Sequence, residues 1–425
     1  MKKHFRQLSS ILFWSVLSAA FIGPGTVTTA AKAGSAYGTS LLWALLFSVV
    51  ATFVLQEMAA RITICSGQTL GQVIRGRQRA GYSWSVGMFV AVAFGCAAYQ
   101  TGNILGALSG LKLITGWPAP YISGGITLLA FLLLWTGNYR LIARGLGVVV
   151  AFMGILFLGV AGRSVVPAWE IVAGTFVPQL PVGSALLAIG LIGTTVVPYN
   201  LFLGAGLSKG QRLKDTRLGL AVAIGLGGVI SAAVLLAGTM VAPPFDFAGL
   251  SDVLVREVGA WAAGFFAIGL FAAGLSSAVT APLAAAVAGQ HLLRAADERW
   301  QTRGLYFRVV WLLVLSVGFG FSLLQVQPVA AIILAQALNG LLLPFAAAFL
   351  LLAANDRELL REHANGRWTN ALGLLVFALS SFLGLKNIVG AVAKALEIAV
   401  GVEMYPILGL MAVGLALLLM RKLSR

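Results

Sequence analysis

Long uninterrupted stretches of apolar residues recur along the whole chain, and they constrain its fold more than any other feature. Each stretch is about 20 residues long, the length that an α-helix needs to cross the hydrocarbon core of a bilayer. Only 10% of the 425 residues are charged and 59% are hydrophobic. A soluble domain of this composition could not keep its apolar surface away from water. The stretches are continuous rather than alternating, which excludes a β-barrel. We therefore expect an all-α, polytopic membrane protein.

The apolar stretches predict about twelve transmembrane helices, in a single membrane domain that covers residues 1–425. The first five helices are expected at about 11–163, the next five at about 184–353, and the last two at about 369–420. The eighth span is expected at about 253–292. The segment 386–400 fits either an interfacial or a spanning helix.

Basic residues gather in every second connection between the predicted spans, and together they give a formal net charge of +16. They include Lys2, Lys3 and Arg6 before the first span, Lys209, Arg212, Lys214 and Arg217 after the sixth, and Arg421, Lys422 and Arg425 at the end. This alternation is the positive-inside pattern. We expect a multi-pass protein of the cell (inner) membrane with both termini in the cytoplasm, and no nucleic-acid partner.

Two of the predicted spans are interrupted by helix-breaking residues. The first contains Gly23-Pro24-Gly25-Thr26 and the sixth contains Val197-Pro198-Tyr199-Asn200. Proline removes a backbone donor, and glycine tolerates the non-helical angles that follow. Broken helices at matching positions of two halves are typical of secondary transporters, whose substrate lies between them at the bilayer midplane. The alternative is an ordinary proline kink in each span.

Three further stretches accompany the two breaks: Leu55–Arg61, Gly274–Ser277 and Ala335–Asn339. With the breaks, they make the chain resemble the Nramp family of divalent-metal transporters, whose first and sixth helices carry Asp-Pro-Gly-Asn and Met-Pro-His-Asn. The resemblance covers nearly the whole chain. It implies a LeuT-like inverted 5+5 helix repeat, with helices 1 and 6 unwound at their midpoints near Gly23–Thr26 and Val196–Tyr199.

The chain departs from this family at the residues of its metal chemistry. Where the family has Asp, Asn, Met and His, this sequence has Gly23, Thr26, Val197 and Tyr199. The acidic residues that the family uses for proton movement have no counterpart in 91–107, where the strongly polar side chains are Gln100 and Asn103. Hard cations prefer carboxylate oxygens, and softer ones prefer thiolate, thioether or imidazole. No metal site of the family's kind is therefore expected.

The predicted site is instead neutral and rich in hydrogen-bond donors. The N-terminal ends of two half-helices favour an anion, and Lys32 adds positive charge near the entrance unless it extends to the outer interface. The expected substrate-binding residues are Gly23, Pro24, Gly25, Thr26, Thr194, Val197, Tyr199 and Asn200. Those expected along the pathway are Lys32, Gln100, Asn103, Ser277, Gln336 and Asn339.

These features predict a secondary transporter that moves a small inorganic ion, not a transition metal, by alternating access. A small anion such as bicarbonate is the favoured substrate, with a coupling cation as an open possibility that would make the protein a symporter. The alternative is a divalent cation of the magnesium or manganese type, held by carbonyls and hydroxyls. A second alternative is a non-transporting scaffold or sensor. No cofactor is expected, and no catalytic grouping at membrane depth indicates an enzyme.

One acidic residue, Glu57 in the second predicted span, lies closer to the membrane interior than the other carboxylates. Arg61 follows it four residues later, on the same face of the helix. This spacing predicts an intrahelical ion pair near the cytoplasmic end of the span. We therefore expect Glu57 to have a structural role.

Overall fold

The computed structural model describes residues 22–76, 81–137, 139–293, 297–324, 326–395 and 404–423, and within these ranges all regular structure is helical. The first half comprises α2 (Pro24–Tyr37), α3 (Leu42–Ser66), α4 (Leu70–Gly76), α5 (Gly81–Lys112), α6 (Ala119–Thr136), α7 (Tyr139–Ala161) and α8 (Ala168–Phe176). The second comprises α9 (Ala185–Thr195), α10 (Pro198–Leu207), α11 (Leu213–Gly238), α12 (Phe247–Val258), α13 (Trp261–Leu292), α14 (Leu305–Leu323), α15 (Pro328–Ala354), α16 (Arg357–Leu360), α17 (Arg367–Ala395) and α18 (Met404–Leu423), with short 3-10 turns at Glu298–Trp300 and Arg361–His363.

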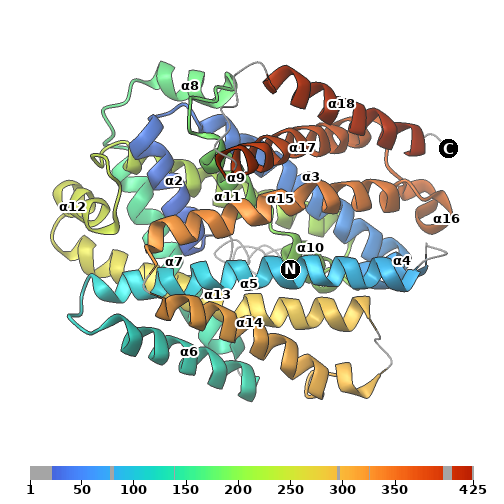
Figure 1. Cartoon of the computed structure of the whole chain (residues 1–425), viewed down its shortest axis with the longest axis horizontal. Helices are drawn as coiled ribbons and strands as arrows, with labels where there is room; N and C mark the ends of the chain where they lie inside the picture. Colours follow the sequence, from blue (N-terminus) through green and yellow to red (C-terminus); the bar gives the residue numbers. More distant parts are fainter. Residues whose placement is uncertain are drawn as a thin grey trace, which may run out of the picture.

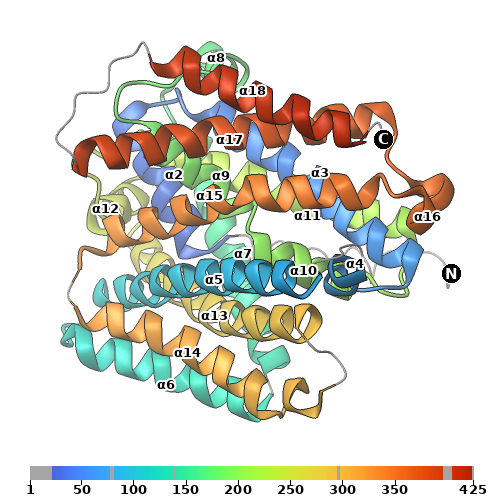
Figure 2. The same cartoon turned by 45° about the vertical axis from the view of Figure 1, so that its right-hand side comes forward.

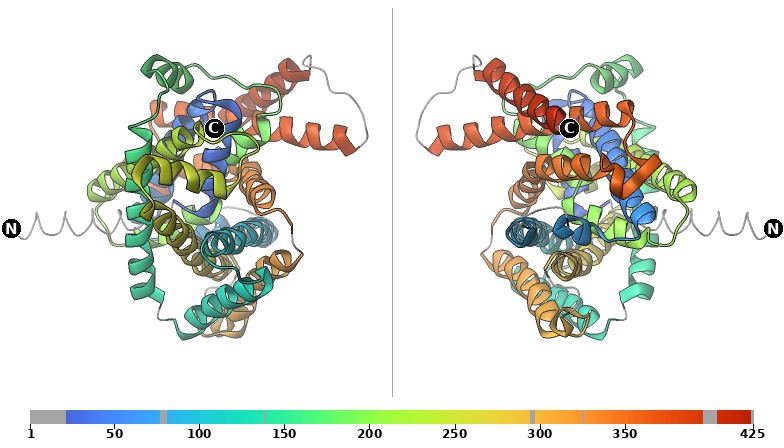
Figure 3. Two further views of the ribbon diagram at one scale, coloured as in Figure 1. Left: turned by 90° about the vertical axis from the view of Figure 1, so that its left-hand side faces the viewer. Right: turned by 90° about the vertical axis from the view of Figure 1, so that its right-hand side faces the viewer.

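Most of the long helices run roughly side by side (Figure 1). The pair α6 and α14 lies on one side and the pair α17 and α18 on the other, as Figure 2 shows after a 45° turn. The segment containing α9 and α10 has 83% of its apolar window inside the protein, whereas α18 has 11%. Figure 3, which looks along the horizontal axis of Figure 1, places α17 and α18 at the edge of the molecule. The broken segment of α9 and α10 is therefore central, and α18 is peripheral.

Ten segments of the described chain are long and apolar enough to cross a membrane, and one of them, Ala185–Gly206, comprises α9 and α10 together. They coincide with ten of the predicted spans. The fifth predicted span corresponds to α7, whose apolar part is the shorter Gly145–Ala161. The second half of the first predicted span corresponds to α2. Residues 11–21 of that span lie outside the described ranges. Peripheral helices expose large apolar side chains, as lipid contact requires; Leu410 and Leu418 of α18 are examples.

Two predicted boundaries were wrong or incomplete. The eighth span does not start at residue 253, because α12 ends at Val258 and α13 begins at Trp261. Gly259 separates them with a φ of 118°, a backbone angle that favours glycine. Residues 386–395 do not form a separate helix, because α17 continues through them to Ala395. Residues 396–400 lie outside the described ranges.

Close crossings at glycine bring the central helices together. A methyl group on Gly34 of α2 would overlap the Leu235 carbonyl of α11, and one on Gly193 of α9 would overlap the Gln336 carbonyl of α15. Small residues allow such backbone contact in membrane helices. The crossing at Gly193 fixes α15 against α9, and it places the side chains around Gln336 next to the break in the sixth predicted span.

Candidate functional site

The break in the sixth predicted span lies where Val197 and Pro198 predict it but is shorter than expected, and in the first span the described residues begin with Ile22 and Gly23 just before α2. α2 begins at Pro24, and Gly23 before it is extended with φ −90° and ψ 174°. α9 ends at Thr195 and α10 begins at Pro198, leaving only Val196 and Val197 in non-helical conformations. Proline suits the first position of a helix, where its missing N–H has no intrahelical partner to lose. Thr26 and Tyr199, predicted to be unwound, are therefore already helical.

The breaks face each other across a hydroxyl–hydroxyl contact. Thr26 Oγ1 lies 2.8 Å from Thr194 Oγ1, and both side chains are about 1% exposed. Either oxygen can donate, because the geometry does not fix the hydrogen. The next residue of α9, Thr195, has its hydroxyl 3.3 Å from Ser48 Oγ of α3. The two segments that sequence reasoning joined in one site are thus in direct contact.

Gln336 of α15 adds an amide to the same place. A methyl group on Gly25 would overlap this amide, so the glycine after Pro24 makes room for it. The Gln336 side chain is fully buried, and neither its nitrogen nor its oxygen has a hydrogen-bond partner among the described residues. Buried amides without partners are rare, since each costs about 1–3 kcal/mol. Gln336, predicted along the pathway, thus borders the break itself.

Beside Gly23 lies a pair of hydroxyl groups, of which sequence reasoning identified only one. The position that a Cβ of residue 23 would take is 3.3 Å from Tyr99 Oη and 3.5 Å from Ser277 Oγ. The Tyr99 ring, on α5, meets the Tyr199 ring of α10 edge-on, with centroids 5.6 Å apart. No sequence spacing indicates Tyr99, although it directly precedes Gln100. Its place depends on how α5 packs against the break.

The other predicted pathway residues make bonds between or within helices. Gln100 Nε2 donates to the Ala278 carbonyl at 3.0 Å and so links α5 to α13, while Asn103 Nδ2 lies 3.4 Å from Gln100 Oε1. Asn339 Nδ2 donates to Ala335 O of its own helix, and its Oδ1 has no partner among the described residues. Lys32 is partly exposed on α2, eight residues and roughly 12 Å beyond Pro24. Of the predicted pathway residues, Gln336 and Ser277 are the ones whose side chains lie against Gly23 or Gly25.

Asn200, predicted to bind the substrate, contacts α3 through its backbone. Its carbonyl accepts a hydrogen bond from Gln56 Nε2 of α3 at 3.3 Å, and its amide donates to Val197 O at 2.9 Å. Gly204, one turn later, leaves space for the Gln56 side chain. Gln56 therefore holds the start of α10 against α3, a role that the sequence did not suggest.

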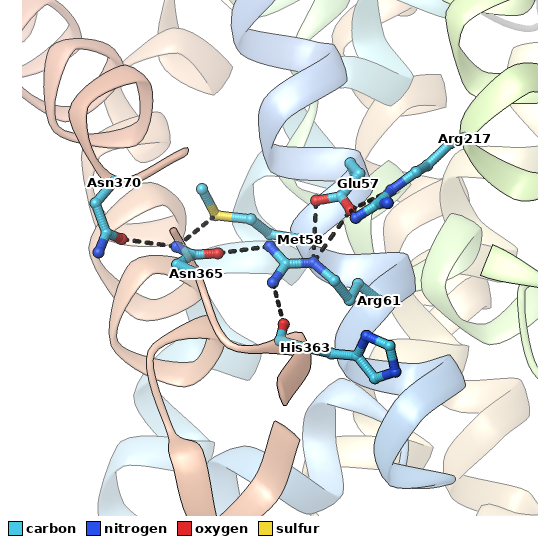
Figure 4. Close-up of polar contacts among 7 residues, drawn as sticks. All are labelled: Glu57, Met58, Arg61, Arg217, His363, Asn365 and Asn370. Atoms are coloured by element: carbon cyan, nitrogen blue, oxygen red, sulfur yellow. Dashed lines mark hydrogen bonds and ion pairs between the residues drawn. The ribbon is translucent and has the colours of Figure 1, made fainter. Parts of the chain in front are cut away.

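A second buried polar group lies near the end of α3, apart from the breaks. Glu57 accepts hydrogen bonds from Arg61 Nε at 3.1 Å and from Arg217 Nη2 of α11 at 2.7 Å (Figure 4). Arg61 also donates to the His363 carbonyl and to Asn365 Oδ1. We call these five residues the Glu57 cluster. The predicted pair between Glu57 and Arg61 is present, and Arg217 and the 363–365 segment join it.

Among the described residues, the contacts around the two breaks come from uncharged groups. We call this group the midpoint site, and it comprises Gly23, Gly25, Thr26, Tyr99, Thr194, Tyr199, Ser277 and Gln336. Its donors and acceptors are hydroxyls, one amide and the ends of helices. Within the described ranges, no three His, Cys, Asp or Glu side chains gather as they would around a metal ion. The carboxylate of Glu57 is engaged by its arginines.

A bundle of apolar helices, in which the start of α2 meets the break between α9 and α10 at a buried polar site, defines a membrane transporter. Residues 15–390 match the family described as natural resistance-associated macrophage protein-like. The chain belongs to this Nramp family.

Similar proteins include the divalent metal cation transporter MntH of Ralstonia nicotianae, 32% identical over 402 residues, with 87% of this chain and 88% of the relative covered. MntH 1 of Pseudomonas aeruginosa is 30% identical, with 87% and 89% covered.

Solved structures support the same fold. A manganese transporter of Eremococcus coleocola, solved with an aromatic bis-isothiourea compound, matches with a TM-score of 0.71 at 20% identity, covering 98% of this chain and 94% of that one. MhsT in complex with L-phenylalanine matches with a TM-score of 0.58 at 18% identity, covering 89% and 98%. The predicted all-α, LeuT-like architecture is confirmed. At these identities the structural matches concern the fold alone.

Proposed function

We propose that this transporter carries a divalent metal cation, and that it holds the ion at the midpoint site through neutral oxygens and water. The relatives at 30% and 32% identity are named for divalent metal cations, which favours this alternative over the bicarbonate expected from the sequence. The observation that carries the proposal is the donor set, in which the Thr26 and Thr194 hydroxyls meet 2.8 Å apart beside the Gln336 amide. Neutral oxygens are ligands for hard cations.

The same donor set favours a magnesium-type ion over a transition metal. Val197 and Tyr199 provide no soft sulfur or imidazole nitrogen, which are the ligands that distinguish transition metals from harder ions. Magnesium dehydrates reluctantly and keeps several of its waters when bound. A site without a carboxylate therefore suits a partly hydrated hard cation that binds weakly and leaves readily. Alternating access around α2, α9 and α10 would then move the ion across the membrane.

A small anion such as bicarbonate is the second candidate, and one specific observation favours it. Two helices begin at this site, α2 at Pro24 and α10 at Pro198. The helix dipole places partial positive charge at both starts. An uncharged site with two helix starts can stabilise an anion without any cationic side chain.

Flux into proteoliposomes distinguishes the two candidates. Vesicles loaded with a magnesium-sensitive dye should report saturable magnesium entry, whereas manganese entry at micromolar concentration should match protein-free vesicles. Vesicles loaded with a pH-sensitive dye should alkalinise on bicarbonate addition only as fast as the protein-free control. Protein-dependent alkalinisation without magnesium entry would replace the cation by the anion. Flux equal to the control for all three ions would contradict transport of either kind and favour the non-transporting scaffold or sensor.

We further propose that the protein lies in the cell membrane with both termini in the cytoplasm, as the basic connections indicate. Of its two cysteines, Cys65 at the end of α3 is partly exposed and Cys96 is buried. The proposed orientation puts Cys65 on the cytoplasmic side. A membrane-impermeant maleimide should label it only after the cells are permeabilised, and labelling of intact cells would reverse the orientation.

A further inference from the structure

The glycine at position 23 is explained by space and not by backbone conformation. Its φ of −90° and ψ of 174° are accessible to any residue, so no left-handed angle calls for glycine here. A Cβ at this position would instead lie 3.3 Å from Tyr99 Oη and 3.5 Å from Ser277 Oγ. The first distance is shorter than ordinary van der Waals contact. A side chain at position 23 would therefore require the Tyr99 hydroxyl to shift by a few tenths of an ångström.

The Tyr99 side chain has little freedom to move away. It is 2% exposed, and the ring of Tyr199, itself 4% exposed, packs edge-on against it at an interplanar angle of 72°. Close packing of this kind transmits strain and resists displacement. A side chain at position 23 would therefore press the Tyr99 hydroxyl of α5 within its packing against the Tyr199 ring of α10.

The position of the Tyr99 hydroxyl also decides what the site offers a substrate. It lies beside Gly23, the extended residue immediately before α2. A phenol both donates and accepts hydrogen bonds and stays neutral at physiological pH. It therefore contributes a neutral oxygen at a point where a carboxylate could otherwise reach the site.

We propose that Tyr99 is a substrate-facing, specificity-determining residue, whose hydroxyl, together with that of Ser277, occupies the space beside Gly23 and keeps the midpoint site free of a carboxylate. This inference rests on the proposed function only for the location of the substrate. It predicts that adding a carboxylate at position 23 is ineffective while the Tyr99 hydroxyl is present. Tyr99→Phe removes that one oxygen and retains the ring.

The binding test uses manganese(II) as the probe and detergent-purified protein. Gly23→Asp alone should show no saturable manganese binding by calorimetry at micromolar concentration. Gly23→Asp with Tyr99→Phe should bind manganese at least about tenfold more tightly than Gly23→Asp alone, because a carboxylate oxygen can then reach the ion. Equal affinity of the single and double variants, or no binding by a folded double variant, would overturn the role of Tyr99.

A second measurement keeps the steric part testable without any ion. Gly23→Ala should lower the melting temperature, and Tyr99→Phe should recover most of that loss when the two changes are combined. Such non-additivity reports direct contact between two sites. Tyr121→Phe, on the exposed face of α6, is the matched control and should not change the effect of Gly23→Ala. Strict additivity with Tyr99→Phe would contradict the contact, whichever ion the protein carries.

Discussion

The midpoint site and the Glu57 cluster are both buried and polar, yet their hydrogen bonding is opposite in character. In the Glu57 cluster, the carboxylate meets two guanidinium groups, and Arg61 has further acceptors in the His363 carbonyl and Asn365. In the midpoint site, the fully buried Gln336 amide has no partner within the described ranges. Buried charges persist in proteins when they are paired, whereas unpaired buried polar groups cost stability and are retained for another reason. This difference supports a structural role for the cluster and agrees with the proposed ligand binding at the midpoint site.

The largest expected effect tests the structural half of this comparison. Glu57→Ala leaves the Arg61 side chain, only 4% exposed, without its counter-charge. Removing one partner of a buried ion pair costs about 3–5 kcal/mol. We expect a large drop in melting temperature, measured by size-exclusion chromatography after heating. Glu257→Ala is the control, because the Arg256–Glu257 pair is more exposed and is worth about 0–1 kcal/mol. Equal effects of the two changes would remove the structural role of the cluster.

The next effect concerns the backbone spacing that forms the midpoint site. Gly193→Ala places a methyl group against the Gln336 carbonyl, a backbone atom that cannot rotate away. Overpacking of this kind costs about 1–3 kcal/mol, and we expect a lower melting temperature together with reduced flux. Gly125→Ala on α6 is the control, because a Cβ there meets nothing within 4 Å. A Gly193→Ala protein as stable and active as the Gly125→Ala protein would show that this crossing does not define the site.

The smallest expected effect on stability has the opposite sign. It distinguishes Gln336, whose amide has no partner among the described residues, from Gln100, whose amide is hydrogen-bonded. Gln336→Leu replaces an unpartnered amide by an apolar group, so stability should be unchanged or higher by up to about 1 kcal/mol. Flux should nevertheless fall, because the proposed ion ligand is lost. Gln100→Leu is the matched control, since it removes a bond to the Ala278 carbonyl and should destabilise by about 1–3 kcal/mol. If Gln336→Leu destabilises as much as Gln100→Leu, its amide has a structural role.

The sequence predicts the break positions well and their surroundings poorly. Glycine and proline act locally, so the non-helical residues at Gly23 and Val197 follow from the chain itself. The meeting of Thr26 with Thr194 follows from two breaks in matching places. Tyr99 could not be predicted, because its contact with the break depends on how α5 is rotated against α2 and α10. This rotation is set by tertiary packing, including the fit of Pro24 against Gly106.

The same distinction holds for the Glu57 cluster. The pair of Glu57 and Arg61 is readable from a spacing of four residues on one helix. Arg217 joins from 160 residues away and appears in the sequence only as one of several basic residues in a connection. Local periodicity therefore predicts the intrahelical bond, and only the packing of α3 against α11 reveals the third member.

The central claim is that the transported ion binds at the midpoint site, and a ligand-dependent melting temperature tests it most directly. Binding to the folded state alone raises stability in proportion to RT ln(1 + [L]/Kd). Magnesium chloride, compared with potassium chloride at equal ionic strength, should raise the melting temperature of the unmodified protein. Magnesium chloride should leave the melting temperature of the Thr194→Val protein unchanged, because this substitution keeps the shape of the side chain and removes the hydroxyl that meets Thr26. Equal magnesium-induced shifts in both proteins would contradict the account by placing the ion elsewhere.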